Sequence, residues 1–176
     1  MAGSVEAHLL ILERGFSREE RERILDIFPD RTVSIVSPVV IYDTSHIISA
    51  YIHAGRLIAR GRSRTRDPAL EVIRSLTGSK QLGESLRIAS PVKGDEKALV
   101  TVAPDEWPRE YDPMDPPGVK FSNPPDTPDG IGSLDYGSIK MELGGERALR
   151  ILGITPGESD NENRMKVLEK VALTDI

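Results

Sequence analysis

The sequence predicts an α/β fold, a mixed sheet packed by helices, in a single domain that spans residues 1–176. Three observations predict it. Apolar and β-branched segments indicate strands at 7–13, 32–42 and 97–104. Segments with helical periodicity or helix-start signals indicate helices at 17–28, 45–58, 69–78, 80–90 and 161–176. A chain of 176 residues can bury a core without disulfides, which the absence of cysteine excludes.

Local signals place the ends of the expected helices. Ser17 followed by Glu20 forms the sequence of a capping box, and Asp43 or Thr44 caps the second helix. Asp67 and Pro68 suit the start of a third helix, since proline is tolerated at the first helical position. Gly78 is a C-cap for that helix, and Ser79 then opens a short fourth helix that Pro91 ends.

Residues 104–137 differ from the rest, because they hold eight of the thirteen prolines. We expect this insertion to be a long surface loop with no regular element, ordered only where an aromatic residue anchors it. The aromatic residues available are Trp107, Tyr111, Phe121 and Tyr136. The strand at 32–42 should be interrupted at Pro38.

Charge is distributed unevenly along the chain. The formal net charge is -5, but residues 44–94 hold nine Lys/Arg against three Asp/Glu, and are therefore +6. The remaining residues carry 14 Lys/Arg and 25 Asp/Glu, and are therefore -11. A local basic patch creates the field that a phosphate experiences, so the acidic total does not exclude a nucleic-acid partner.

No segment indicates secretion or a membrane. The apolar run at 8–12 is too short for the core of a signal peptide, and no run reaches the ~18 apolar residues of a membrane span. We expect a cytoplasmic protein with no membrane contact.

Catalytic and cofactor motifs are missing from the sequence. His46 and His53 are seven residues apart with no carboxylate at metal-ligand spacing, and His8 stands alone. Neither a phosphate-binding glycine loop nor a serine-nucleophile motif occurs. We therefore expect no metal, no cofactor and no catalytic residue, and predict that the protein is not an enzyme.

Five arginines lie between residues 56 and 66, and they allow two interpretations. The first is a solvated loop that pairs with acidic parts of the same chain. The second is a surface for single-stranded RNA, since arginine binds phosphates through two hydrogen bonds and stacks on bases. The candidate RNA-binding residues are Arg56, Arg60, Arg62, Arg64, Arg66, Arg74, Lys80 and Arg87, with His46 and His53 as weaker candidates. Arg74 and Arg87 could instead pair with Glu71 and Glu84 within their helices.

Residues 70–102 hold an ordered set of short motifs: Glu71 at the start of an apolar helix, the turn Thr77-Gly78-Ser79-Lys80-Gln81, and Glu84-Ser85-Leu86 in a second helix, followed by the expected strand Ala98–Val102. This set resembles the small tRNA-binding accessory subunit of the KEOPS complex, the family of the p53-related-protein-kinase-binding protein. The family's pattern is a glutamate and an apolar helix, a Ser/Thr-Gly-x-Arg/Lys-Gln turn, and a second helix with Glu-Ala-Ile/Leu. Residues 46–54 and 167–176 are similar to the family's preceding helix and its C-terminal helix.

The resemblance covers most of the chain outside the insertion, with three departures. Lys80 stands where arginine is common, which keeps the charge but loses the planar fork. Ser85 replaces the usual alanine, and the proline-rich insertion has no counterpart.

What the resemblance implies is a non-catalytic subunit. It would bind the single-stranded 3′ CCA end of tRNA and dock on the small atypical protein kinase/ATPase of KEOPS, the complex that makes threonylcarbamoyladenosine in tRNA. For the kinase contact we expect the C-terminal helix to supply Val167, Val171 and Leu173, with ordinary core packing as the alternative for these residues. A stripe of Met165, Leu168 and Ala172 lies on another side of that helix.

Two other functions are also compatible with the sequence. One is a purely structural kinase-binding adaptor that binds no RNA, and another is an enzyme whose site the sequence does not reveal. When isolated, the subunit could also form a homodimer through an exposed apolar helix.

Overall fold

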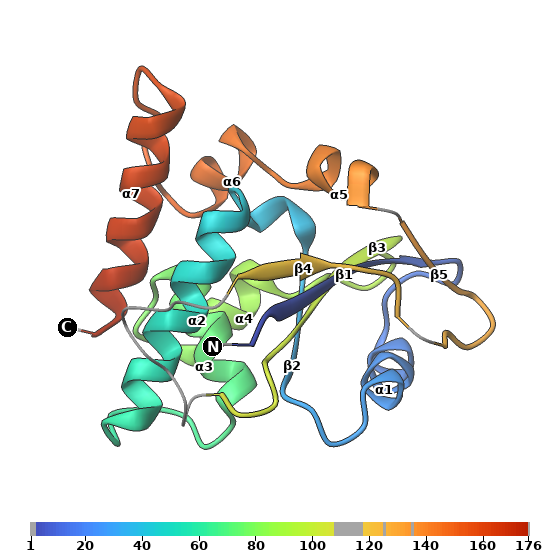
Figure 1. Ribbon diagram of the computed structural model, residues 1–176. Coiled ribbons are helices and arrows are strands. Elements are labelled where there is room, and N and C mark those ends of the chain that lie inside the picture. Colours follow the sequence, from blue (N-terminus) through green and yellow to red (C-terminus); the bar gives the residue numbers. More distant parts are fainter. Residues whose placement is uncertain (1–2, 108–117, 125, 135, 176) are drawn as a thin grey trace.

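The computed structural model describes residues 3–107, 118–124, 126–134 and 136–175, and confirms the α/β class (Figure 1). Its mixed sheet comprises five strands: β1 Val5–Leu12, β2 Val33–Val36, β3 Lys97–Val102, β4 Val119–Phe121 and β5 Ile131–Ser133. The helices are α1 Arg18–Ile27, α2 Thr44–Ala59, α3 Pro68–Thr77, α4 Leu82–Ala89, α5 Tyr136–Glu142, α6 Glu146–Ile151 and α7 Asp160–Ala172. Two 3₁₀ turns, η1 Pro38–Val40 and η2 Leu173–Asp175, complete the described elements.

β1 is the central strand. It pairs antiparallel with β3 along one edge, and β3 pairs antiparallel with β2, which makes β2 an outer strand. Along its other edge β1 pairs with two short strands, parallel with β4 near its start and antiparallel with β5 near its end. The strand order is therefore β2-β3-β1-β4. The fifth strand, β5, pairs with β1 along the same edge as β4 but farther along β1.

Alternation along the strands separates two cores. Val5, Ala7 and Leu9 belong to one hydrophobic cluster, with residues of α2 and α3, whereas Leu10 and Leu12 belong to a second cluster, with residues of α1. Side chains alternate between the two faces of a strand. The helices α2, α3 and α4 therefore cover one face and α1 covers the other.

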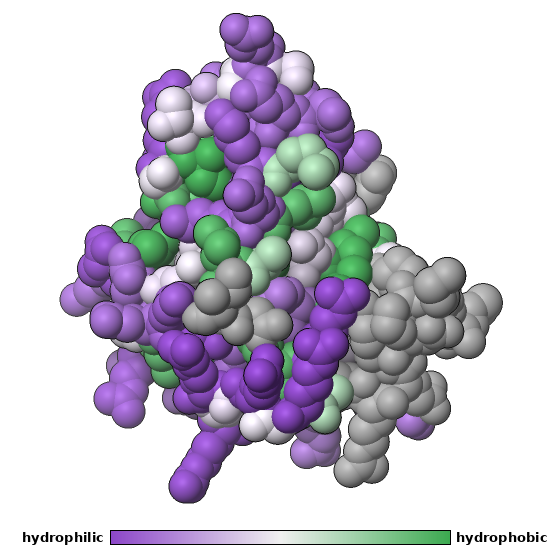
Figure 2. Space-filling view, turned by 90° about the vertical axis from the view of Figure 1, so that its left-hand side faces the viewer, coloured by the Kyte–Doolittle hydropathy of each residue, from purple (hydrophilic) through white to green (hydrophobic). Residues whose placement is uncertain are grey.

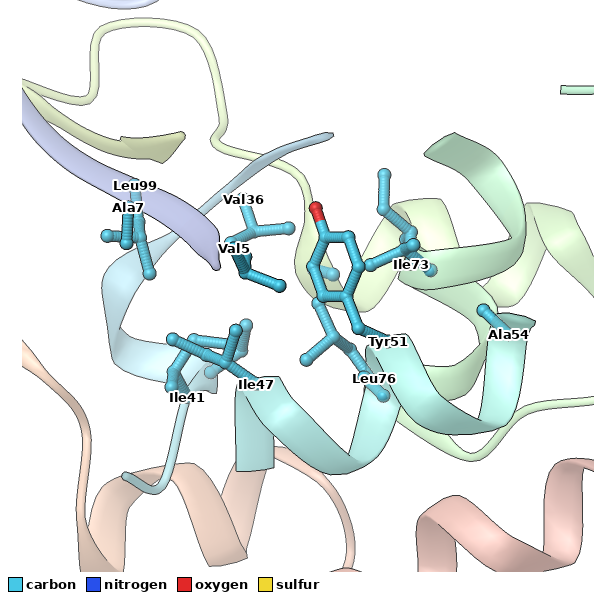
Figure 3. Packing of buried hydrophobic residues seen from close by; sticks show 14 of the residues in the cluster. Val5, Ala7, Val36, Ile41, Ile47, Tyr51, Ala54, Ile73, Leu76 and Leu99 are labelled. Atoms are coloured by element: carbon cyan, nitrogen blue, oxygen red, sulfur yellow. The ribbon is translucent and has the colours of Figure 1, made fainter. Parts of the chain in front are cut away.

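Tyr51 lies at the centre of the larger core. Its ring lies among apolar side chains from the sheet and from α3, including Val36 and Ile73 (Figure 3). Its hydroxyl donates a hydrogen bond to Thr101 Oγ1 over 2.9 Å, so the one polar atom of this buried side chain is satisfied. Burial raises the pKa of the Tyr51 hydroxyl well above its usual value.

The predicted helix starts are confirmed where a side chain caps them. Ser17 accepts from the Glu20 N–H, Asp43 from the His46 N–H and Asp67 from the Ala69 N–H. The fourth helix begins later than predicted. Gln81 is its N-cap, because Ser79 Oγ instead accepts from the Gln81 N–H in the preceding turn.

The prediction that the insertion holds no regular element is wrong. β4 and β5 lie within residues 104–137, and α5 begins at its end. The short stretches 119–121 and 131–133 contain no proline and can complete a ladder with β1. Trp107 does act as an anchor: its Nε1–H donates to the Tyr51 carbonyl over 3.2 Å, and its ring meets Tyr51 edge-on. Phe121 packs against the larger core, whereas Tyr111 and the Tyr136 side chain lie outside the described residues.

Candidate functional site

Apart from exposed Lys93, which follows α4, the positive charge of the 44–94 segment lies on three pieces of the chain: the end of α2, the loop 60–67, and the α3–α4 region. Of the predicted RNA-binding residues, six are exposed: Arg60, Arg62, Arg64, Arg66, Lys80 and Arg87. Arg56, in the last turn of α2, is half-buried. We call the exposed residues of the loop and the α3–α4 turn, Arg60, Arg62, Arg64, Arg66 and Lys80, the basic surface.

The loop and the turn meet directly. Arg64 Nη1 donates to the Lys80 carbonyl oxygen at 3.5 Å, although the two residues are sixteen apart in sequence. The loop that follows α2 lies at the lower left of the molecule in Figure 1, and the lower part of the corresponding face is mainly hydrophilic in Figure 2. Two cationic segments therefore share one end of the molecule.

A buried ion pair holds these two segments. Arg74 and Glu71, one turn apart on α3, pair at 2.6 Å with side chains only 1% and 0% exposed. Glu71 Oε2 accepts from Ser63 Oγ at 2.9 Å and from the Arg64 N–H at 3.2 Å, which fixes the arginine loop. Arg74 Nη1 donates to the carbonyls of Ser79 and Lys80, each at 3.2 Å, which fixes the α3–α4 turn.

The expectation that Arg74 contacts RNA is therefore wrong for this structure, because its guanidinium is used inside the protein. The alternative of an intrahelical pair is confirmed for Arg74. At Glu84, the corresponding partner for Arg87, a carboxylate oxygen instead accepts from Ser79 Oγ at 3.0 Å. Sequence analysis missed that the Glu71–Arg74 pair is interior, although its apolar neighbours Val72, Ile73 and Leu76 were a usable signal.

The two histidines are also interior, so the expectation that they contact RNA is wrong for this structure. His46 is fully buried: its Nδ1 accepts from the Tyr42 N–H at 3.1 Å, and its Nε2 lies 2.7 Å from the Leu76 carbonyl. This pattern assigns the neutral ring with the proton on Nε2. Burial lowers the pKa of His46 to about 4. His53 is 9% exposed, in the same helix.

The turn at Gly78 is shaped by two constraints. Its φ is +67°, in the left-handed region, and a Cβ there would lie 2.6 Å from the Lys170 carbonyl oxygen of α7. Glycine satisfies both constraints. The turn that carries Lys80 is consequently packed closely against the C-terminal helix.

The C-terminal helix has an inner and an outer apolar side. Val167 and Val171 are each 1% exposed and face the interior, so the expectation that they contact a partner is wrong, and their alternative role as core residues holds. The reason is the packing of α7 against α2 and α3. Met165 and Leu173 are 59% and 47% exposed. With half-buried Leu168 and exposed Ala172, they form what we call the outer stripe of α7, which includes Leu173, the residue that caps the helix and begins η2.

Two further features bear on function. In the part of the chain that the structure describes, no three or more histidine, aspartate or glutamate side chains gather where they could hold a metal ion. Across those same residues, no helix has the length and apolar character needed to cross a membrane.

Comparison with known proteins provides no assignment: no family model matches the sequence, and no curated protein matches it. The candidate site therefore depends on its geometry and on the resemblance carried by residues 70–102.

Proposed function

We propose that the protein is a non-catalytic, tRNA-binding subunit of the KEOPS complex, which binds the single-stranded 3′ CCA end and docks on the complex's small atypical protein kinase. The observation that supports this proposal best is the basic surface. Its cations are exposed on two segments that one buried ion pair holds together.

The chemistry of the basic surface suits a flexible anionic strand. Guanidinium groups bind phosphate oxygens in pairs and stack on unpaired bases, and four of the five cations in this surface are arginines. A single strand exposes both its phosphates and its base faces, whereas a duplex hides the latter. The protein would thus bind the strand chiefly through charge and stacking.

The Glu71–Arg74 pair supports the proposal through preorganisation. A loop with several arginines loses conformational entropy when it binds a ligand, which weakens binding. Here the backbone at Arg64 and the carbonyl of Lys80 are already fixed by the pair. Part of that entropic cost is therefore incurred on folding rather than on RNA binding.

Kinase docking would use the outer stripe of α7 rather than its buried valines. Met165 and Leu173 expose apolar surface on a helix whose inner side already has its own core. Exposed apolar side chains grouped on one helix side are typical of protein interfaces. Figure 2, which faces α7, shows hydrophobic side chains among polar ones on this face. The outer stripe is equally consistent with the alternative function, an adaptor that binds the kinase and no RNA.

The test is a titration of the isolated protein with whole tRNA and with tRNA lacking its 3′ CCA, each at two salt concentrations. The substituted variant replaces Arg60, Arg62 and Arg64 by Gln, and its matched control replaces three exposed arginines outside the basic surface, Arg14, Arg147 and Arg150. Loss of three phosphate contacts should reduce the salt slope by about 2, at ~0.7 per contact for a single strand. The control should retain the slope.

The outcomes separate the candidate functions. Salt-sensitive binding that weakens without CCA, and weakens further only in the first variant, supports the proposed function. Equal binding to both tRNAs would make the basic surface a nonspecific phosphate surface. Absence of binding would contradict the RNA-binding role and leave the kinase-binding adaptor.

A further inference from the structure

A groove of about 440 Å³ runs along the outer edge of the sheet, beside strand β2. It lies between α1 and the α3–α4 pair. Its floor is apolar, formed by Leu25, Val33, Ile35, Leu70, Ile73 and Leu86. Its residues are distinct from the basic surface, so an inference about the groove does not depend on RNA binding.

The backbone at this groove has an open edge. The Ala103 N–H donates to the Thr32 carbonyl at 3.0 Å, and the register pairs Val33 with Val102 and Ile35 with Val100. Because bonded and non-bonded pairs alternate in an antiparallel ladder, the backbone groups of Val33 and Ile35 point away from β3. No hydrogen bond from these outward groups is found within the described residues.

The next odd-numbered residue confirms this orientation. The Ser37 N–H donates outward, to the Ala89 carbonyl at the end of α4, over 2.7 Å. The outer edge of β2 is therefore hydrogen-bonded at Ser37, whereas the outward backbone groups of Val33 and Ile35 are unbonded within the described residues. These two strand residues line the groove, and they are 9% and 7% exposed. Unpaired strand edges bind extended polypeptide readily, through backbone hydrogen bonds.

The rim of the groove is positively charged. Arg18 and Arg21, one turn apart on α1, line the groove and are exposed. A third arginine, Arg31, is already paired with Glu6 and Asp105. The one acidic residue in the lining is Asp67, whose carboxylate caps α3. The charge at the rim thus favours an acidic ligand.

We propose that this groove binds an extended, acidic segment of a partner protein as an added strand beside β2. Alternate side chains of such a segment would enter the apolar floor. The side chains in between, on the other face of the bound segment, would bring carboxylates to Arg18 and Arg21. Its backbone would pair with the outward groups of Val33 and Ile35. A second copy of this chain is a poorer occupant, because antiparallel pairing of two β2 edges would bring like-charged rims together.

The probe is a displayed library of random twelve-residue peptides, selected against the intact protein. The expected peptides alternate apolar residues with Asp or Glu. On binding, they should slow hydrogen exchange at the amides of Val33 and Ile35 and leave Ser34 and Val36 unchanged, since the latter already face β3. Alternate backbone N–H groups of the bound peptide point towards β2 or away from it. N-methylation of the residues whose N–H points towards β2 should therefore abolish binding, whereas N-methylation of the residues in between should leave binding intact.

The protein variants test the charge of the rim. Arg18→Glu with Arg21→Glu should weaken the selected peptides at least about tenfold, which is ~1.4 kcal/mol. Arg147→Glu with Arg150→Glu, the same charge change on α6, should alter binding less than about twofold.

Four results would overturn the proposal. The first is that no peptide is enriched, and the second is that the enriched peptides bind the Arg18→Glu, Arg21→Glu variant as tightly as the unchanged protein. The third is that N-methylation has the same effect on affinity at every position. The fourth is that, without peptide, slow hydrogen exchange at Val33 and Ile35 depends on protein concentration. The last result would assign the edge to a second copy of the chain.

Discussion

Glu71 and Arg74 form an ion pair within a single turn of α3, yet each also bonds to a segment outside that helix. The carboxylate contacts the loop before α3 and the guanidinium contacts the turn after it. A pair that is local in sequence therefore determines how two cationic segments lie relative to one another.

Removing one member of this pair should be costly. We expect Arg74→Met or Glu71→Gln to lower the free energy of unfolding by about 3–5 kcal/mol, because either change leaves a buried charge or its bonded partners uncompensated. Replacing both residues by methionine should cost less than the sum of the single changes. Urea unfolding of the singles and the double, analysed as a double-mutant cycle, measures the coupling.

Arg87→Met is the matched control, since Arg87 is an exposed arginine in the last turn of the neighbouring helix α4. It should change stability by less than about 0.5 kcal/mol. If Arg74→Met also changed the stability by less than about 0.5 kcal/mol, the Arg74 guanidinium would not hold the loop and the turn as the structure indicates.

The sequence predicted the elements whose local signals are strong, and the reasons for its failures are physical. The caps at Ser17, Asp43 and Asp67 and the C-cap at Gly78 act over a few residues and could be predicted. β4 and β5 could not, because each is three residues long and depends on pairing with distant β1. Three-residue strands carry too little periodicity to be recognised.

Only part of the candidate site could be predicted, because exposure in a loop follows from local sequence whereas burial on a helix depends on tertiary packing. Loop arginines such as Arg62 are exposed because a loop cannot bury so many charges. Arg74 and His46 are cationic or polar residue types like those of the loop, so the sequence did not distinguish them from exposed residues. Helix packing nevertheless places both side chains in the interior. The inner and outer sides of α7 were likewise misassigned, because both carry apolar residues and only tertiary contact decides between them.

Buried His46 should make stability depend on pH. Its pKa is about 4 in the folded protein, against 6.5 in the unfolded chain, so the unfolded state binds more protons between these values. The free energy of unfolding should therefore fall as the pH drops from about 6.5 towards 4, by up to ~3 kcal/mol from this group. Above pH 7 its contribution should be constant. Denaturant unfolding at a series of pH values measures the slope.

His46→Gln is the variant that assigns this slope, since glutamine does not titrate. The variant should be less stable at neutral pH but flatter between pH 6.5 and 4. A residual slope is expected from His8, whose pKa burial also lowers. An unchanged slope in the variant would place the titrating group elsewhere.

Gly78→Ala should destabilise the fold more than a matched glycine elsewhere. Gly61 has nearly the same φ, +65° against +67°, but a Cβ at Gly61 would meet nothing within 4 Å. Both substitutions place an alanine in the left-handed region, at ~1–2 kcal/mol. Only Gly78→Ala also pushes against the Lys170 carbonyl. Thermal unfolding of the two variants isolates this close approach, and equal losses would mean that α7 shifts freely.

The outer stripe of α7 gives the last prediction. If the proposed kinase docking is correct, Met165→Ser with Leu173→Ser should weaken binding of the purified KEOPS kinase by about tenfold or more, since the two side chains expose the largest apolar surface of the stripe. Because both are exposed, stability should change by less than about 0.5 kcal/mol per site. Val167→Ala, on the inner side, should do the reverse: it should lose about 1–2 kcal/mol of stability through its cavity and retain kinase binding while folded. Calorimetric titration with the kinase, beside thermal unfolding of each variant, measures both quantities. Kinase binding that survives the outer double substitution would exclude this stripe as the docking surface.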